Sequence, residues 1–293
     1  MDAIAYPMSI ATPIPVALAN LIKFGILNGM ELVDTHCHIQ FPDYGQKEGF
    51  DASDAITAAQ AEAVTRLLCV GTDLPDSRRA IDFVQQRDNC WATIGLHPHE
   101  GASYAHDNKA LEEFAALVSQ PKVVAIGECG LDYYYHHSPK ADQEKILRWQ
   151  LELATTYKLP CVFHVRDAFD DFWKIVDNYP GITGVIHSFT ADKKVLLQTL
   201  QRGYYVGLNG IMTFTRTEAQ LEAAKAVPLD KLLLETDAPF LTPVPFRGKI
   251  CQPKHVRLTA QFLANLRGET LSELASATTA NALSLFNLSN VYE

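Results

Sequence analysis

The sequence predicts a (β/α)8 barrel of the TIM type, an α/β fold built as a single domain. Eight short apolar runs rich in branched side chains alternate with helical segments from Glu31 onward, which is typical of parallel strands joined by helices. The chain has 293 residues, and a barrel of this kind often fills such a length as one unit. A doubly wound open sheet is the alternative, but it would not readily bring the ends of the first, fourth, fifth, sixth and eighth strands to one point.

The predicted strands are short enough to be buried strands of a parallel sheet. They are expected at residues 31–36, 66–71, 91–96, 122–127, 160–164, 183–187, 204–208 and 232–236. Helices are expected at 110–118, 140–158, 168–179, 192–200 and 218–226, with two more at 254–267 and 270–286 after the last strand. Their apolar residues recur at helical spacing. Pro160 closes the long second helix, and Thr270 with Glu273 has the spacing of a capping box.

Residues 1–29 differ from the rest in composition. They hold only two charges, Asp2 and Lys23, together with three prolines. A secretory signal would need a basic start, and a membrane span would need about 20 apolar residues without interruption. We therefore expect an N-terminal extension, to which the sequence assigns no role, followed by a barrel over 30–293. A short helix at 16–27 packed on the barrel is expected, with transient membrane association as the alternative.

Composition limits the partners of the chain. The hydrophobic share of 47% is that of a globular protein with a sizeable core. The formal net charge is −9, so the protein cannot wrap long nucleic acid by neutralising its phosphates alone. Metal ions and a few local basic residues would have to attract a phosphate polymer. The six cysteines include no C-x-x-C pair, which favours buried, reduced thiols in a cytoplasmic protein. A monomer without stable membrane association is favoured.

Polar residues that can bind a divalent cation end five of the predicted strands. They are His36 and His38 on the first strand, Glu128 on the fourth, His164 on the fifth, His187 on the sixth and Asp237 on the eighth. Side chains at the carboxyl ends of barrel strands converge, and so many buried polar groups would not remain unpaired. The pattern therefore predicts a metal centre with two divalent ions.

The ligand types narrow the chemistry of this centre. His36 and His38 are two residues apart, so both face the same side of a strand, and Cys37 between them points away. Imidazole and carboxylate ligands together suit Zn²⁺, Mn²⁺, Fe²⁺ or Ni²⁺ and tolerate Mg²⁺. Glu128 can bridge two ions with its two oxygens. Asp237 can ligate an ion, hold the attacking water and accept its proton.

With these residues placed, residues 31–288 resemble the TatD family of metal-dependent deoxyribonucleases, which are amidohydrolase-like barrels. The motifs that carry the resemblance are DTHCH (34–38), GLHPH (95–99), GECGLDYY (127–134), HVRDAF (164–169), GVIHSF (184–189), LLLETDAPFLTPVPFRGK (232–249) and TTANALSLF (278–286). Two departures are small. HSF replaces the common HCF, and Ile250-Cys251-Gln252 follows RGK where the family usually has an acidic or Asn-containing stretch. The resemblance implies that the same six residues bind a pair of divalent ions and that the reaction is exonucleolytic hydrolysis of DNA, with 3′-5′ action on single-stranded ends expected.

Four residues near this centre are candidates for substrate contact. His97 follows the third strand and could contact a phosphate or only satisfy a loop. Tyr133 could stack a base or belong to a packed tyrosine cluster. Arg166 faces the barrel mouth two residues after His164, where a guanidinium could bind a phosphate with two donors. Arg247 could add local positive charge, with a surface salt bridge as the alternative.

Two other functions fit the same residues less well. An ester or amide hydrolase, for example an aminoacyl-tRNA deacylase, would keep the barrel and the metals, because a fold does not determine a substrate. A metal-stabilised binding module without turnover would not need a residue that activates water. The retained Asp237 and Glu128 therefore favour an enzyme.

Overall fold

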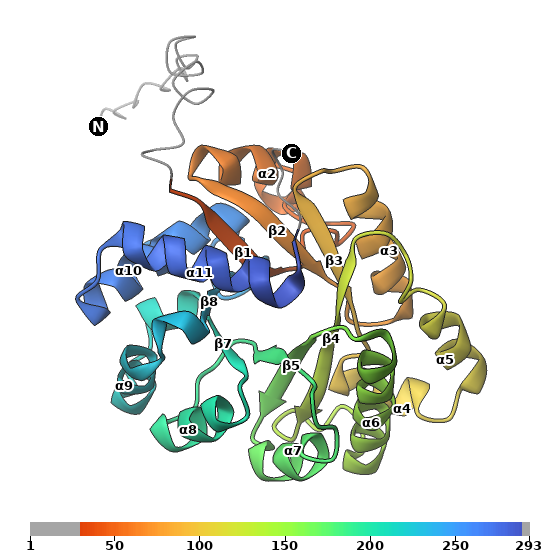
Figure 1. Cartoon of the computed structure of the whole chain (residues 1–293). Coiled ribbons are helices and arrows are strands. Elements are labelled where there is room, and N and C mark those ends of the chain that lie inside the picture. Colours follow the sequence, from red (N-terminus) through yellow and green to blue (C-terminus); the bar gives the residue numbers. More distant parts are fainter. Residues whose placement is uncertain (1–29, 289–293) are drawn as a thin grey trace, which may run out of the picture.

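The computed structural model describes residues 30–288, and it contains eight parallel strands in one sheet with the order β1 to β8. The strands are β1 (Leu32–Cys37), β2 (Val64–Val70), β3 (Cys90–Ile94), β4 (Val123–Asp132), β5 (Cys161–Arg166), β6 (Gly184–Ile186), β7 (Tyr205–Leu208) and β8 (Leu232–Leu234). Each predicted strand overlaps one of them. Helices surround the strands (Figure 1), so the predicted TIM-type barrel is confirmed.

The first and last strands meet at their carboxyl ends. The backbone N–H of Asp237 donates to the carbonyl of His36 at 2.8 Å, and that of His38 donates to the carbonyl of Ala238 at 2.6 Å. Cys37 and Ala238 form a parallel bridge. The barrel is therefore closed at the segment that carries His36, His38 and Asp237.

Ten α-helices lie within the described residues: α2 (Ala52–Ala61), α3 (Leu74–Gln85), α4 (Gly101–Tyr104), α5 (Asn108–Ala115), α6 (Lys140–Tyr157), α7 (Phe169–Val176), α8 (Lys193–Gln201), α9 (Glu218–Ala226), α10 (Val256–Arg267) and α11 (Leu271–Phe286). Short 3-10 helices are η2 (Gln46–Glu48), η3 (Pro98–Glu100), η4 (Gly210–Thr213), η5 (Leu229–Lys231) and η6 (Pro253–His255).

All seven predicted helices are present, and the capping box at α11 is confirmed: Thr270 accepts from the N–H of Glu273 at 3.1 Å and Glu273 accepts from the N–H of Thr270 at 2.9 Å. The sequence prediction did not include α2, α3 or α4. The predicted helix at 16–27 lies outside the described residues. Within residues 30–288 no helix has the length and hydrophobicity needed to cross a bilayer.

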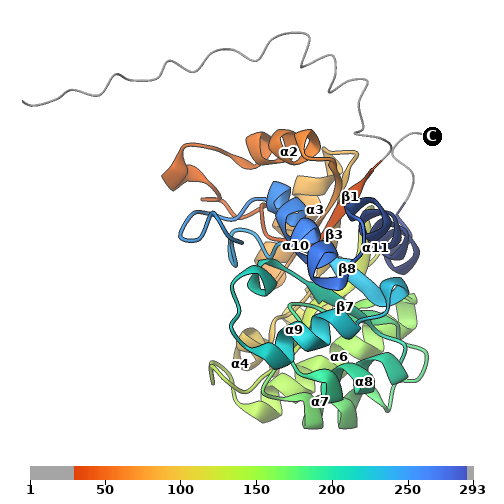
Figure 2. The same ribbon diagram turned by 90° about the vertical axis from the view of Figure 1, so that its left-hand side faces the viewer.

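The amino end of the barrel is filled and covered. One buried side chain from each of seven strands packs into a common cluster: Val33, Leu68, Trp91, Ala125, Val162, Val185 and Leu233. Ala282, Leu285 and Phe286 of α11 join this cluster, and Asn281 of α11 donates to the carbonyl of Leu232 at the start of β8. Figures 1 and 2 show α11 beside the start of β1. The interior of the barrel is therefore closed at its amino end by apolar packing.

Strands β1 and β4 depart from regular alternation of their side chains near His36 and Glu128. The register shifts between Asp34 and Cys37 in β1 and between Ile126 and Cys129 in β4. Such an irregularity re-aims the side chains that follow it. Strict alternation from inward-facing Val33 would send His36 outward. The shift brings His36 to the interior instead, and the shift in β4 does the same for Glu128.

Beside this point β4 and β5 approach each other closely. Gly130 has a φ of 150°, and a Cβ there would clash with the carbonyl oxygen of His164. A residue without a side chain is therefore required, so that β5 can bring His164 next to Glu128.

Candidate metal centre

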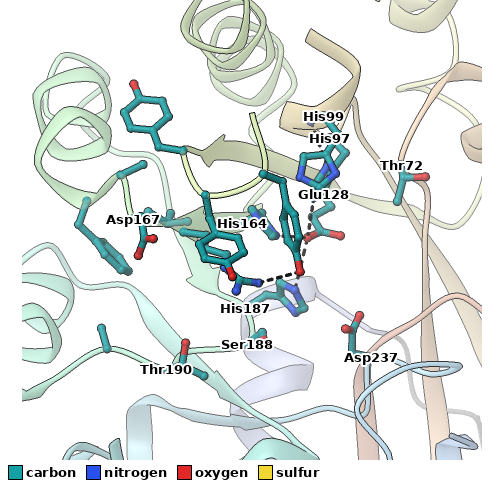
Figure 3. A pocket seen from close by; sticks show the side chains of 18 of the residues that line it. Thr72, His97, His99, Glu128, His164, Asp167, His187, Ser188, Thr190 and Asp237 are labelled. Atoms are coloured by element: carbon teal, nitrogen blue, oxygen red, sulfur yellow. Dashed lines mark hydrogen bonds and ion pairs between the residues drawn. The ribbon is translucent and has the colours of Figure 1, made fainter. Parts of the chain in front are cut away.

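The six residues predicted as metal ligands lie together at the carboxyl end of the barrel. His38, Glu128, His164, His187 and Asp237 line an open pocket, and His36 is fully buried beside them. Figure 3 shows Glu128, His164 and His187 pointing toward one another, with Asp237 across the pocket.

Glu128 divides these side chains into two sets. Its Oε1 lies 2.8 Å from Nδ1 of His164 and 3.3 Å from Nε2 of His187. Its Oε2 lies 3.4 Å from Nε2 of His36 and 4.0 Å from Nε2 of His38. Each carboxylate oxygen thus faces a separate pair of imidazoles, which is the arrangement that a bridging ligand needs.

Asp237 completes the set around the first two histidines. Its Oδ1 lies 3.4 Å from Nε2 of His38 and 3.6 Å from Nε2 of His36. Burial alone would raise the pKa of Asp237, but the surrounding histidines, beginning with His38, hold it below its ordinary value. Asp237 is therefore an anion that faces the pocket.

Hydrogen bonds behind the histidines decide which nitrogen faces the centre. His38 Nδ1 contacts the carbonyl oxygen of Val70 at 2.7 Å. A carbonyl only accepts, so Nδ1 carries the proton and Nε2 presents its lone pair. By the same argument Glu235 accepts from His187 Nδ1 at 3.1 Å, and Nε2 of that ring faces Glu128.

His164 uses its nitrogens in the opposite order. Its Nε2 contacts Oδ2 of Asp132 at 2.9 Å, and its Nδ1 contacts Oε1 of Glu128 at 2.8 Å. A carboxylate only accepts, so a ring proton can serve either contact, and Nδ1 is the nitrogen that faces the centre. In His36, Nδ1 has no hydrogen-bond partner among residues 30–288, and Nε2 lies 3.2 Å from Nε2 of His38.

The converging atoms fit a divalent cation. Imidazole nitrogens and the oxygens of two carboxylates face one another, which costs free energy unless protons or cations lie between them. Three groups of three side chains have ligand atoms within 4.8 Å of one another: His36, His38 and Glu128; His97, Glu128 and His164; and His36, His187 and Glu235. The donor set therefore suits metal ions, and Glu128 belongs to two of the three groups.

His97 carries its ring proton on the nitrogen that faces the pocket. Its Nδ1 accepts the backbone N–H of His99 at 3.1 Å, and burial holds its pKa well below the ordinary value. The neutral ring therefore carries its proton on Nε2, which lies 3.6 Å from Oε1 of Glu128. In this tautomer His97 is a hydrogen-bond donor toward the pocket, and it could act as a metal ligand only after Nε2 loses its proton. Its contact with substrate stays a prediction.

Two carboxylates outside the predicted ligand set support the histidines, and sequence reasoning missed the first of them, Glu235. Glu235 is buried and also accepts from the N–H of Ser188 at 2.7 Å. It lies two residues before Asp237, so alternation along β8 could have placed it on the same face. Asp132 accepts from His99 at 3.1 Å as well as from His164.

Two of the other three proposed substrate contacts line the pocket, and the third does not. Arg166 is exposed on the pocket wall. Tyr133 also lines the pocket, but its hydroxyl donates to Glu144 at 3.3 Å and Lys140 covers its ring. Arg247 lies outside the described pocket lining, where its guanidinium donates to the carbonyl of Thr242 and stacks on a phenylalanine.

The cysteines next to the ligands are placed as expected. Cys37 and Cys129 are buried and unpaired with other cysteines. Cys37 donates to the carbonyl of Leu68 at 3.3 Å, and both side chains belong to the apolar cluster that includes residues of the surrounding helices. Neither belongs to the groups of potential ligand atoms among residues 30–288.

Comparison with known proteins gives consistent matches over the barrel. A sequence model of the family described as TatD related DNase matches residues 33–287. The "Uncharacterized metal-dependent hydrolase YabD" of Bacillus subtilis is 38% identical over 260 residues, covering 88% of this chain and 99% of that protein. The "3′-5′ ssDNA/RNA exonuclease TatD" of Citrobacter rodentium is 36% identical over 247 residues, covering 81% and 92%.

Solved structures agree with these matches. The crystal structure of YJJV, a TatD homologue from Escherichia coli, has a TM-score of 0.80 and 29% identity, covering 88% of this chain and 98% of that chain. A TatD family hydrolase from Entamoeba histolytica has a TM-score of 0.79 at 22% identity, covering 89% and 99%. The second similarity concerns the fold alone.

Proposed function

Because the chain belongs to the TatD-related DNase family of metal-dependent hydrolases, we propose that it hydrolyses phosphodiester bonds of DNA with two divalent ions. The reaction proposed is 3′-5′ exonucleolytic release of nucleotides from single-stranded ends. The Citrobacter rodentium relative, a 3′-5′ ssDNA/RNA exonuclease by name, supports this polarity and substrate. The six free, buried cysteines support a reducing compartment, and we place the reaction in the cytoplasm.

One observation carries the two-ion part of the proposal: the two oxygens of Glu128 face different histidine pairs. His36, His38 and Asp237 would hold one ion, His164 and His187 the other, and Glu128 both. When bound, such a pair would stabilise the charge of a phosphate as a Lewis acid. It would also lower the pKa of a water, which then loses a proton more readily and attacks the phosphate. Mg²⁺, Mn²⁺ and Zn²⁺ all fit this ligand set.

Side chains of the protein can accept the proton of the attacking water and orient the substrate. Asp237 is ionised, and its side chain keeps 16% of its surface exposed to the pocket, so an oxygen can accept the proton of an attacking water. The Nε2–H of His97 points to the same floor and can donate to a phosphate oxygen. Buried His36 and His187 stack with ring centroids 3.7 Å apart, which fixes both imidazoles against rotation.

The proposal is tested with single-stranded DNA labelled at either end. With Mg²⁺ or Mn²⁺ added, a 5′ label should yield a ladder that shortens stepwise, while a 3′ label should appear at once as mononucleotide. The opposite pattern would reverse the polarity. If DNA stays intact with every metal while the aminoacyl group is released from aminoacyl-tRNA, the protein hydrolyses a carboxylic ester and not a phosphodiester. Intact substrates of both kinds would contradict hydrolysis of either.

A further inference from the structure

Three aromatic side chains on the pocket wall are unusually exposed for their size. Tyr134, Tyr135 and Phe240 keep 52%, 49% and 53% of their surface accessible, and all three line the pocket above the metal centre. Single exposed aromatic residues are ordinary. A group of them around one polar site is a recognisable binding surface.

The two tyrosines are held in place by Asp132. Its Oδ1 accepts the backbone N–H of Tyr134 at 2.9 Å and of Tyr135 at 3.0 Å. Its Oδ2 accepts from His164 at 2.9 Å. One carboxylate therefore fixes both the loop that carries the rings and a predicted metal ligand, so the distance between rings and centre is constrained.

Arg166 orders the rings and adds charge. Its guanidinium lies 4.0 Å from the ring centre of Tyr134 and 4.8 Å from that of Tyr135. The two rings meet edge to face with centroids 4.8 Å apart. A guanidinium stacked in this way keeps donors at its edge for a phosphate. Lys140 adds a second positive charge to the same wall.

We propose that Tyr134 and Tyr135, ordered by Arg166, form a stacking platform for nucleobases next to the scissile phosphate of single-stranded DNA. The inference rests on the proposed function and specifies how its substrate is held. Flat aromatic surface beside positive charge binds single strands without regard to sequence, because every base has a π-face. Tyr133 is the less suitable neighbour, because it is only partly exposed and its hydroxyl donates to Glu144 at 3.3 Å.

The platform is tested by binding, apart from cleavage. The probe is a dye-labelled oligothymidylate with phosphorothioate linkages, which resist hydrolysis, measured by fluorescence anisotropy with the Mg²⁺-loaded protein. Tyr134→Ala should weaken binding by about 5- to 150-fold, the range for one stacked base. Tyr134→Phe should bind like wild type, because stacking requires the ring and not the hydroxyl. The alanine variant keeps the backbone N–H that Asp132 binds, so its metal content should stay unchanged.

Two controls separate stacking from charge and from general damage. An abasic strand of equal length and charge should bind weakly to wild type and should not distinguish Tyr134→Ala from it. Tyr157→Ala removes another exposed tyrosine, at the end of α6. It lies outside the described pocket lining, so this variant should bind normally. Equal affinity of wild type and Tyr134→Ala for the thymidylate, or no binding by wild type, would overturn the platform. Ring-dependent binding without any DNA cleavage would support the platform and contradict the nuclease.

Discussion

Oδ2 of Asp132 lies 2.9 Å from Nε2 of His164, and this contact turns the other imidazole nitrogen toward Glu128. Carboxylates behind metal-binding histidines fix the tautomer and orientation of the ring. Asp132 lies at the end of β4 and His164 within β5, so the alignment of two neighbouring strands sets the contact.

Asp132→Asn is expected to weaken metal binding. In this variant an amide NH₂ group would replace Oδ2, so two donors would meet where His164 now donates to an acceptor. The ring would then lose its preferred orientation. We expect an affinity loss of about 10- to 100-fold, measured by competition with a chelator. Asp142→Asn is the matched control, because Asp142 contacts exposed His106 on the surface. Equal affinities in the two variants would contradict the role assigned to Asp132.

Glu128→Ala is expected to release at least one ion per chain. The two oxygens of Glu128 provide the only side-chain carboxylate in the described residues that faces all four predicted histidine ligands. Metal content by inductively coupled plasma mass spectrometry checks the loss, with circular dichroism to verify folding. Glu100→Ala, which removes another carboxylate of the same pocket lining, should keep the full content. Unchanged metal in Glu128→Ala would count against bridging.

Asp237→Asn is expected to reduce turnover by about 10²- to 10⁴-fold, the range for a positioned acid–base group. The amide keeps the size of the side chain and one ligand oxygen but loses most of the basicity. Turnover of single-stranded DNA should be compared at saturating metal, so that weaker ion binding is not mistaken for slower chemistry. Near-normal turnover would move the proton-accepting role to another group.

Metal binding is expected to weaken as the pH falls. Burial would lower the pKa values of His38, His164 and His187, but their carboxylate neighbours raise all three above the ordinary value. A raised histidine pKa means that protons already compete for the ligand nitrogens near neutrality, so binding must release them. Calorimetry in buffers of different ionisation enthalpy should show proton release, and affinity should fall as the pH drops through the raised pKa values of these histidines. Constant affinity without proton release would contradict this account.

The sequence predicted the strands of the barrel and the location of the centre well, because both depend on local patterns. Val162 and His164 in β5 lie on regular alternation, so their common face could be read directly. Asp237 follows the end of β8 in a left-handed conformation, and its place was predicted only from its position after the apolar run. The irregular register of β1 and β4 could not be read, because a bulge has no distinct pattern in a short apolar run. His36 and Glu128 were placed correctly because each ends its run.

The supporting contacts were beyond sequence reasoning for a different reason. The carbonyl of Val70 that orients His38 belongs to another strand, and no side-chain type marks a backbone acceptor. The choice among Tyr133, Tyr134 and Tyr135 depends on their exposure in the folded chain, where Tyr133 is half-buried and the other two are exposed. Helix α2 was missed because its alanine-rich sequence shows little apolar periodicity, although Asp51 caps it in the structure.

The most direct test of the central claim joins metal stoichiometry to cleavage. Protein stripped by a chelator is titrated with Mn²⁺, and bound ions per chain are measured in parallel with mononucleotide release from single-stranded DNA. We expect little release before the second ion binds and full activity at two ions per chain. Full activity at one ion per chain, or release that is unaffected by the chelator, would contradict a reaction that depends on both ions held by Glu128.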